Sequence, residues 1–206
     1  FLKILFKTRF IWSLPKEKTF LIYDNNCVDY FFKYFKKKNT SILFTRGENL
    51  CIPVLIQTIF KSGLNQIILN YFINYINLIN PKIIITMTDN DLRFYLLKKQ
   101  LNKSIKIISI QNGMIGSRNF FENFYKFKKQ KKLSFSCDYI LCTNEKLKKK
   151  YRKIIRAKII SIGSFKSNSI KIKKFKKQNH ILFLSQYNPP KKTNNAKFLA
   201  NKKFVI

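Results

Sequence analysis

Acidic residues are scarce in this sequence, which has nine Asp and Glu against 42 Lys and Arg in 206 residues, a formal charge of +33. Such a charge normally indicates a polyanionic partner, such as nucleic acid or an anionic membrane. Here, however, 36 of the basic residues are Lys and only six are Arg, and Phe, Ile and Asn are abundant beside Lys. This joint bias is typical of AT-rich coding sequence, which places Lys on any solvated surface. The charge alone therefore names no function.

Several kinds of site are disfavoured by other residues that are rare. The five Gly form neither a Gly-x-Gly-x-x-Gly motif nor a Walker phosphate-binding run. The single His, His180, has no Ser/His/Asp set around it, and the four Cys lack disulfide or zinc-ligand spacing. We therefore expect no metal site, no bound cofactor in this chain and no hydrolase triad.

Long hydrophobic runs are missing as well. The apolar runs fall far below the roughly 20 residues that a helix needs to cross a bilayer, and residues 1–10 mix Lys and Arg among apolar residues, unlike a signal peptide. We expect a cytoplasmic protein that can contact the inner face of the membrane peripherally. The chain begins without Met and ends soon after a turn-rich stretch, which we interpret as a fragment.

Short apolar strands alternate with helical patterns along most of the chain. Strands without polar alternation are buried on both faces, and strands separated by helices are usually parallel. The sequence therefore predicts an α/β fold with a doubly wound, mostly parallel, Rossmann-like sheet. The expected strands are 19–23, 41–45, 82–86, 105–110, 138–142 and 158–163, and the expected helices are 28–37, 53–62, 64–79, 92–101 and 144–155.

Four segments follow from this pattern. Residues 1–18 are a lead-in, residues 19–166 form the Rossmann-like domain, and the Lys-rich residues 167–179 are a linker. A further apolar strand after His180 begins a second domain, 180–206, which is truncated.

A basic, aromatic segment at 117–132 has no clean period, so we expect an irregular excursion. Its aromatic residues can lie on anionic lipid headgroups or stack on single-stranded nucleic acid, although core packing is the favoured alternative. The residues concerned are Phe120, Phe121, Phe124, Tyr125 and Phe127, interleaved with Lys126, Lys128 and Lys129.

In a parallel α/β sheet, sites form outside the carboxyl ends of the strands. The loop after the second expected strand contains Arg46, Gly47 and Glu48. Arg46 can hold a phosphate or carboxylate with two hydrogen bonds, Gly47 lets the backbone approach closely, and Glu48 can accept a proton from an attacking hydroxyl. The alternative is an Arg–Glu pair that only braces a turn.

Asp89, Asn90 and Asp91 follow the next strand. Two carboxylates two residues apart can share a divalent ion, but Asp is also a favoured helix cap, and Asp91 directly precedes an apolar helical run. We favour capping over a metal site, with hydrogen bonding to a substrate as the remaining role.

Two further turns are candidates for binding. Gln111, Asn112 and Gly113 follow the most apolar strand, and an Asn-Gly pair can expose backbone N–H groups to a sugar or phosphate oxygen. Gly163 and Ser164 precede the linker and can line a cleft between domains, although a plain turn explains them as well.

Several of these segments together resemble a family. They are KIIIT at 82–86 followed by Asp89-Asn90, IISIQNG at 107–113, CDYIL at 137–141, ISIGSFK at 160–166 and ILFLSQY at 181–187. The set resembles bacterial surface-carbohydrate biosynthesis proteins: capsule and lipopolysaccharide glycosyltransferases of the GT-B type and, more distantly, polyglycerol-phosphate transferases. The resemblance covers most of residues 19–187.

The resemblance implies a two-domain transferase that works without a metal ion. Its N-terminal domain, here 19–166, would hold a carbohydrate or lipid-linked sugar acceptor, and its C-terminal domain a nucleotide-sugar donor. The second domain is nearly absent from this sequence, so no donor-binding residue can be named. An inverting reaction would need a base for the acceptor hydroxyl; Glu48 is the first candidate and Asp89 the second, with Arg46 and 111–113 orienting the acceptor.

Two alternatives remain open. A basic nucleic-acid-binding protein would explain the charge, but Arg, the usual reader of bases, is rare, and no recognisable nucleic-acid-binding motif is present. An inactive gene fragment would explain the missing domain. The glycosyltransferase hypothesis requires Glu48, Asp89 and Asn112 to lie along one edge of the sheet.

Overall fold

A computed structural model describes residues 8–113, 119–130 and 133–168. The chain divides into two units, residues 1–171 and residues 172–206, and the second lies outside the described residues. So do residues 169–179 of the expected linker and the expected second domain with His180.

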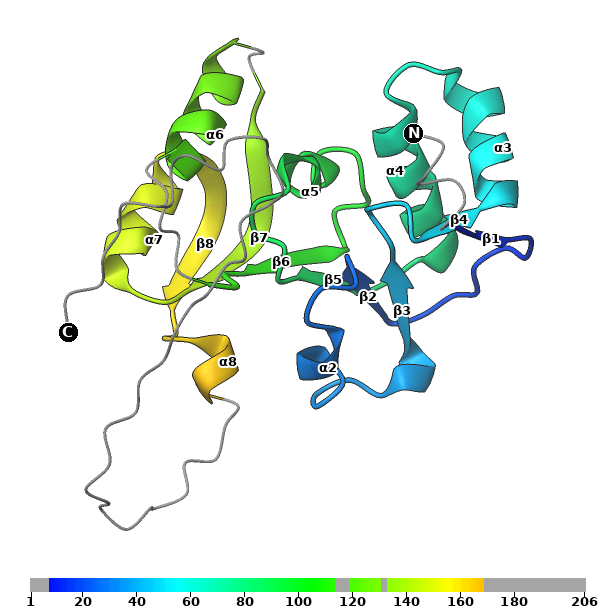
Figure 1. Cartoon of the computed structure of the whole chain (residues 1–206). Coiled ribbons are helices and arrows are strands. Elements are labelled where there is room, and N and C mark those ends of the chain that lie inside the picture. Colours follow the sequence, from blue (N-terminus) through cyan, green and yellow to red (C-terminus); the bar gives the residue numbers. More distant parts are fainter. Residues whose placement is uncertain (1–7, 114–118, 131–132, 169–206) are drawn as a thin grey trace, which may run out of the picture. The chain divides into compact units, whose positions relative to one another are not determined.

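The main sheet has six parallel strands in the order β3-β2-β5-β6-β7-β8 (Figure 1). The expectation of an α/β fold with a parallel sheet is therefore confirmed, and the arrangement is Rossmann-like. Adjacent residues face opposite sides of the sheet, and Leu21, Ile22, Ile84 and Ile85 are all buried, as expected for strands covered on both faces. The strands are β2 (Phe20–Tyr23), β3 (Thr40–Leu43), β5 (Ile83–Thr86), β6 (Lys106–Ile110), β7 (Phe135–Cys142) and β8 (Ile155–Ser161).

The direction in which the chain crosses the sheet decides which face each helix covers. The chain first steps from β2 outward to β3, then returns past β2 to β5 and continues in one direction to β8. Because parallel crossovers are right-handed, this reversal moves the connections from one face to the other. One face carries α2 (Val28–Phe31) and a 3-10 turn at Lys37–Asn39; the other carries α3 (Ile52–Ser62), α4 (Ile67–Ile79), α5 (Leu92–Leu97), α6 (Asn119–Gln130) and α7 (Glu145–Arg152).

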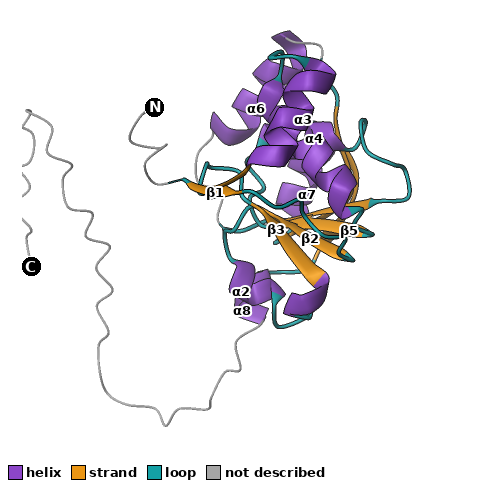
Figure 2. Ribbon diagram, turned by 90° about the vertical axis from the view of Figure 1, so that its right-hand side faces the viewer, coloured by secondary structure: helices purple, strands orange, loops and turns teal. Residues whose placement is uncertain are grey.

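Figure 2 shows the resulting layers, with α3, α4 and α6 above the sheet and α2 and α8 (Phe165–Asn168) below it. The core above the sheet is the larger one and contains Tyr23, Phe72 and Phe94. The smaller core below it is built around Ile22, Phe31 and Ile110. The ring of Phe165 lies 6.2 Å from that of Phe31, so α8 packs beside α2.

The helix that follows β6 corrects one expectation. Residues 119–130, expected to be irregular, form the helix α6. Phe124 is buried and packs on Phe135, while Tyr125 remains exposed. Three lysines in its second half, together with aromatic residues on more than one side, concealed the apolar spacing of α6.

Other boundaries also differ from the sequence-based expectation. The expected helix 28–37 is reduced to α2 and the separate 3-10 turn, and the helix expected over 92–101 ends at Leu97. A second, two-stranded parallel sheet pairs β1 (Arg9–Ile11) with β4 (Asn49–Cys51). Strands of three residues have too little pattern to be predicted, and β1 lies within the segment expected to be a lead-in.

The helices α3 and α4 form a hairpin next to β1 and β4 (Figure 1). Among the described residues, no single helix is long and apolar enough to span a bilayer. Taken together α3 and α4 reach the required length and composition, but the pair is bent by 116° at its break.

Candidate functional site

The chain crosses the sheet first from β2 to β3 and then in the opposite direction from β5 to β8. This change places a topological switch point between β2 and β5. At such a point the loops that leave two neighbouring strands diverge toward opposite faces, which opens a crevice at the carboxyl edge of the sheet. The loops after β2, β3, β5 and β6 all end on this edge because the strands are parallel. We call this edge, with its residues 24–27, 44–48, 87–91 and 111–113, the switch-point rim.

Asp24 anchors the loop that leaves β2. It is 1% exposed, and its Oδ2 accepts hydrogen bonds from the Thr45 hydroxyl (2.9 Å) and from Arg46 Nε (3.0 Å). Its Oδ1 accepts from the Asn26 amide (2.9 Å), and its own backbone has φ of 75°. A non-glycine residue in this region is strained and is held there by its surroundings. The carboxylate thus fixes the loops after β2 and β3 to each other.

Asp91 joins β2 to the start of α5. Its side chain caps α5 by accepting from the Arg93 amide (3.0 Å), and Arg93 Nε and Nη2 also donate to it. The Tyr23 hydroxyl donates to Asp91 Oδ2 (2.8 Å). Burial, followed by the negative charge of Asp91, raises the pKa of Tyr23 above its ordinary value. The carboxylate therefore has a capping role, as the sequence indicated, and also holds Arg93 in place.

Asp89 lies deeper in the rim and is 8% exposed. The Tyr151 hydroxyl of α7 donates to its Oδ2 (2.7 Å), while its backbone carbonyl accepts from the buried Tyr95 hydroxyl (2.9 Å). Burial raises the pKa of the Asp89 carboxyl, and the Tyr151 hydroxyl and the Asn112 backbone N–H oppose that rise. Asp89 and Asn112 are therefore neighbours on the rim.

The raised pKa of Asp89 predicts a pH effect on stability. In the unfolded chain the carboxyl ionises near its usual pKa of about 4, whereas in the folded protein it keeps its proton to higher pH. The unfolded state thus gains more from ionisation, and the free energy of unfolding should fall as pH rises from about 4 through the raised pKa. Asp89→Asn should remove this contribution, so the stability of the variant relative to wild type should increase over that range. Urea unfolding at a series of pH values measures the difference, and two parallel curves would contradict the assignment.

The hydroxyl group of Thr88 is a buried polar group of the rim that makes no hydrogen bond within the described part of the chain. Thr88 is 9% exposed, and its Oγ1 is the buried side-chain oxygen or nitrogen that lacks a partner among the described residues. Buried hydroxyls nearly always have a partner, and leaving one without it costs about 1–3 kcal/mol. Thr88 lies two residues beyond the carboxyl end of β5 and directly precedes Asp89 in the chain.

Glu48 occupies the outer end of the rim, after β3. Its Oε2 accepts from the Arg46 amide (3.1 Å), and its Oε1 has no partner among the residues that the structure describes. The strand β2 separates β3 from β5, so the two strands that lead to Glu48 and Asp89 are about 10 Å apart. Arg46 itself pairs with Asp24 rather than with the Glu48 side chain. Glu48, Asp89 and Asn112 thus follow three strands on the same edge of one sheet.

Asn112 and Asn90 supply amide groups to the rim. The Cys27 thiol donates to Asn112 Oδ1 (3.6 Å), which links the loop after β2 to the loop after β6. Asn90 is exposed in the turn between Asp89 and Asp91. These two amides, with the Asp89 and Asp91 carboxyl groups of the same rim, can donate to and accept from the hydroxyl groups of a ligand.

Other predicted residues have evident structural contacts. Gln111 is 3% exposed. Its Oε1 accepts from the Thr143 amide (3.0 Å) and its Nε2 donates to the Gly113 carbonyl (2.8 Å), so Gln111 connects the loops after β6 and β7.

Gly163 has φ of 75°, and Ser164 Oγ accepts from the Ser167 amide (3.2 Å) at the start of α8. Both follow β8, at the far end of the sheet from β3.

An apolar cavity of about 420 Å³ borders the outer end of the rim. Arg46, Gly47 and Arg93 contribute to its wall, together with apolar side chains of α3 and α4. The guanidinium carbon of Arg93 lies 5.2 Å from the centre of the Phe72 ring. The sequence did not single out Arg93, although its position two residues after Asp91 is a usable signal.

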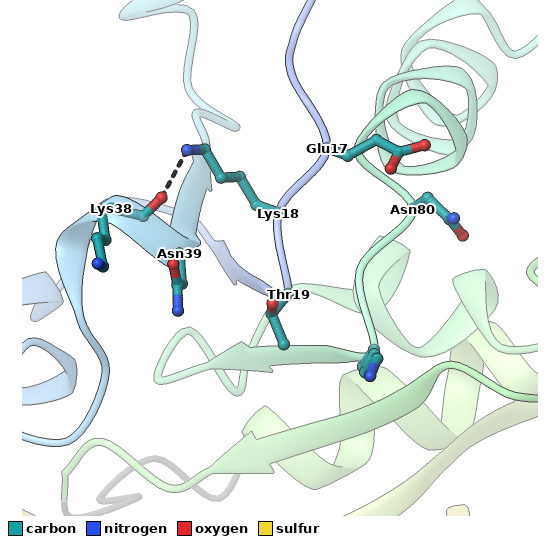
Figure 3. Close-up of a pocket in the computed structure, with 7 residues that line it drawn as sticks. Glu17, Lys18, Thr19, Lys38, Asn39 and Asn80 are labelled. Atoms are coloured by element: carbon teal, nitrogen blue, oxygen red, sulfur yellow. Dashed lines mark hydrogen bonds between the residues drawn. The ribbon is translucent and has the colours of Figure 1, made fainter.

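A second hollow of about 450 Å³ lies at the opposite edge, where β2, β3 and β5 begin (Figure 3). Its wall is polar and contains Glu17, Lys18 and Lys38, and Lys18 Nζ donates to the Lys38 carbonyl. Sites of parallel α/β sheets lie at the carboxyl edge, so this hollow lies on the edge opposite to the switch-point rim.

Metal coordination at the rim is not favoured by these contacts. Asp89 is bound to Tyr151 and Asp91 to Arg93, so the two carboxylates do not converge on one point. Within residues 8–113, 119–130 and 133–168 no three His, Cys, Asp or Glu side chains lie together.

The second half of the chain matches a known family. Residues 108–205 match the model of a family described as "putative O-antigen biosynthesis protein". The match covers just under half of the chain and supports a role in the biosynthesis of surface polysaccharide. It begins in β6, so 111–113 and Tyr151 are the parts of the site inside it. No curated protein and no solved structure matches the chain.

Proposed function

We propose that this chain binds the acceptor in a nucleotide-sugar-dependent glycosyl transfer that builds surface polysaccharide. The observation that supports it is the unpaired, buried hydroxyl of Thr88, the residue before Asp89 in the loop that leaves β5 at the switch point. A sugar hydroxyl can both donate and accept, so it can pair with an unpaired hydroxyl or with a carboxyl oxygen. Asn90 and Asn112 add two amides to the same rim.

Glu48 is the proposed general base. Of the acids on the rim, Asp24 accepts three hydrogen bonds, Asp91 holds Arg93, and Asp89 accepts from Tyr151. Glu48 accepts one backbone hydrogen bond through Oε2. A base needs a free oxygen within reach of the hydroxyl it deprotonates, which favours Glu48 and leaves Asp89 to orient the acceptor.

Four of the nine acidic residues of the chain lie on the rim, namely Asp24, Glu48, Asp89 and Asp91. Asp24 pairs with Arg46 and Asp91 pairs with Arg93, so the rim is not the positive patch that a nucleic-acid phosphate would need. Its carboxyl and amide groups can hydrogen-bond to the hydroxyl groups of a sugar.

A transfer assay tests the proposal. The complete gene product is incubated with nucleotide sugars and lipid-linked glycans extracted from bacterial membranes, and acceptor masses are followed by mass spectrometry. The proposal expects an acceptor that gains the mass of one sugar residue. Unchanged acceptor masses across the available nucleotide sugars, with tight binding of a polynucleotide instead, would contradict it.

A further inference from the structure

The hairpin of α3 and α4 carries apolar side chains on its outer surface. Ile56, Ile59 and Phe60 recur at the spacing of one helical face of α3, and all three are exposed, Phe60 to 86%. Leu64, in the turn between the helices, is 74% exposed, and Ile68 at the start of α4 is 55% exposed. We call these five residues the hairpin patch.

The hairpin patch takes no part in the core. The inward side of α3 is buried through Val54 and Thr58, and that of α4 through Phe72 and Ile76. The hairpin therefore has two apolar sides, of which folding uses one. Several large apolar side chains exposed on one such element are typical of an interaction site.

The charges of this region fit an anionic bilayer. No acidic residue occurs from Asn49 to Thr88, and the only charged residue within α3 and α4 is Lys61, next to Phe60 at the hairpin end. An apolar surface with Lys at its margin and no nearby carboxylate in the sequence complements the apolar interior and the negative surface of an anionic bilayer.

One neighbouring feature fits a lipid. The apolar cavity of about 420 Å³ has Ile68 of the hairpin patch in its wall, together with Leu55, Ile67 and Phe72. It therefore offers apolar space for a hydrocarbon chain next to the patch.

We propose that the hairpin patch docks in the interfacial layer of an anionic phospholipid bilayer. The sharp bend between α3 and α4 favours insertion of the hairpin end over a span. Phe60 and Leu64 enter the acyl boundary, while Lys61 stays among the headgroups. The five residues of the hairpin patch lie outside the switch-point rim, so substituting them tests docking without changing a residue of the glycosyl-transfer proposal.

Vesicle flotation tests it. The protein should float with mixed phosphatidylcholine and phosphatidylglycerol vesicles. The double variant Phe60→Ser, Leu64→Ser should lower the partition coefficient about 100-fold, because two large apolar side chains no longer leave water. Both side chains are exposed, so unfolding in urea should be unchanged, which separates lost docking from lost folding.

Tyr125→Ser provides the matched control. Tyr125 is 58% exposed and lies on α6, in the aromatic, Lys-rich segment for which the sequence left lipid contact open as an alternative to core packing. The inference expects wild-type flotation from this variant. It is overturned if Tyr125→Ser abolishes flotation while the double variant floats normally. It is equally overturned if the wild type does not float but forms a dimer in solution that the double variant dissociates.

Discussion

Replacing Glu48 by Gln in the complete protein should lower kcat for sugar transfer by about 100-fold or more, the usual contribution of a general base. The substitution keeps size and hydrogen-bonding capacity but removes the ability to take up the acceptor proton. The backbone amide of Arg46, which donates to Oε2 of Glu48 in the wild type, can still donate to the oxygen of the new side-chain amide. We therefore expect KM for the acceptor to change little. Initial rates in the transfer assay give both constants.

Glu17→Gln is the control for that experiment. Glu17 borders the polar hollow at the amino edge of the sheet (Figure 3) and so lies on the opposite edge from the rim. Its substitution should leave kcat and KM at wild-type values. A Glu48→Gln enzyme with the wild-type kcat would remove Glu48 from the role of base.

Asp24→Ala should lower the free energy of unfolding by about 3 kcal/mol, because it leaves buried polar groups without partners and puts Ala in a strained conformation. The Thr45 hydroxyl and the Asn26 amide both donate to this carboxylate, and the backbone at Asp24 has φ of 75°. Arg46, whose side chain is 54% exposed, can turn to water and adds little to the cost. Urea unfolding measures the change.

Two further variants serve as controls for the stability loss expected of Asp24→Ala. Asp29→Ala removes an exposed carboxylate five residues away and should change stability by no more than about 0.5 kcal/mol. Asp24→Asn keeps an acceptor oxygen and tolerates a positive φ, so its loss should be smaller than that of Asp24→Ala. Equal stabilities for Asp24→Ala and wild type would show that Asp24 does not hold the two loops together.

The strands of the central sheet were predictable because a strand buried on both faces is an uninterrupted run of apolar residues in the sequence. β5 and β6 coincide within one residue with apolar runs in the sequence. The pairing of β1 with β4 was not predictable, since each has three residues and its partner lies about 40 positions away. The helix α6 was missed because its buried positions, such as Phe124, stand among three lysines and aromatic residues on more than one side.

The edge that carries the candidate site was also predictable, but its contacts were not. The rule that loops at the carboxyl ends of parallel strands converge placed Glu48, Asp89 and Asn112 on one edge. The hydrogen bond from Tyr23 to Asp91 and the ion pair of Asp24 with Arg46 join residues 68 and 22 positions apart. Such pairs depend on strand order, which the pattern of apolar residues does not contain. The unpaired Thr88 hydroxyl likewise appears only once its surroundings are packed.

Hydrogen–deuterium exchange with and without a lipid-linked glycan acceptor tests most directly whether the switch-point rim is the binding site. Bound acceptor should slow exchange in 24–27, 45–48, 88–91 and 111–113, and leave 17–19, 38–39 and 80–82 at the amino edge unchanged. Protection at the amino edge with none at the rim would contradict the proposed site.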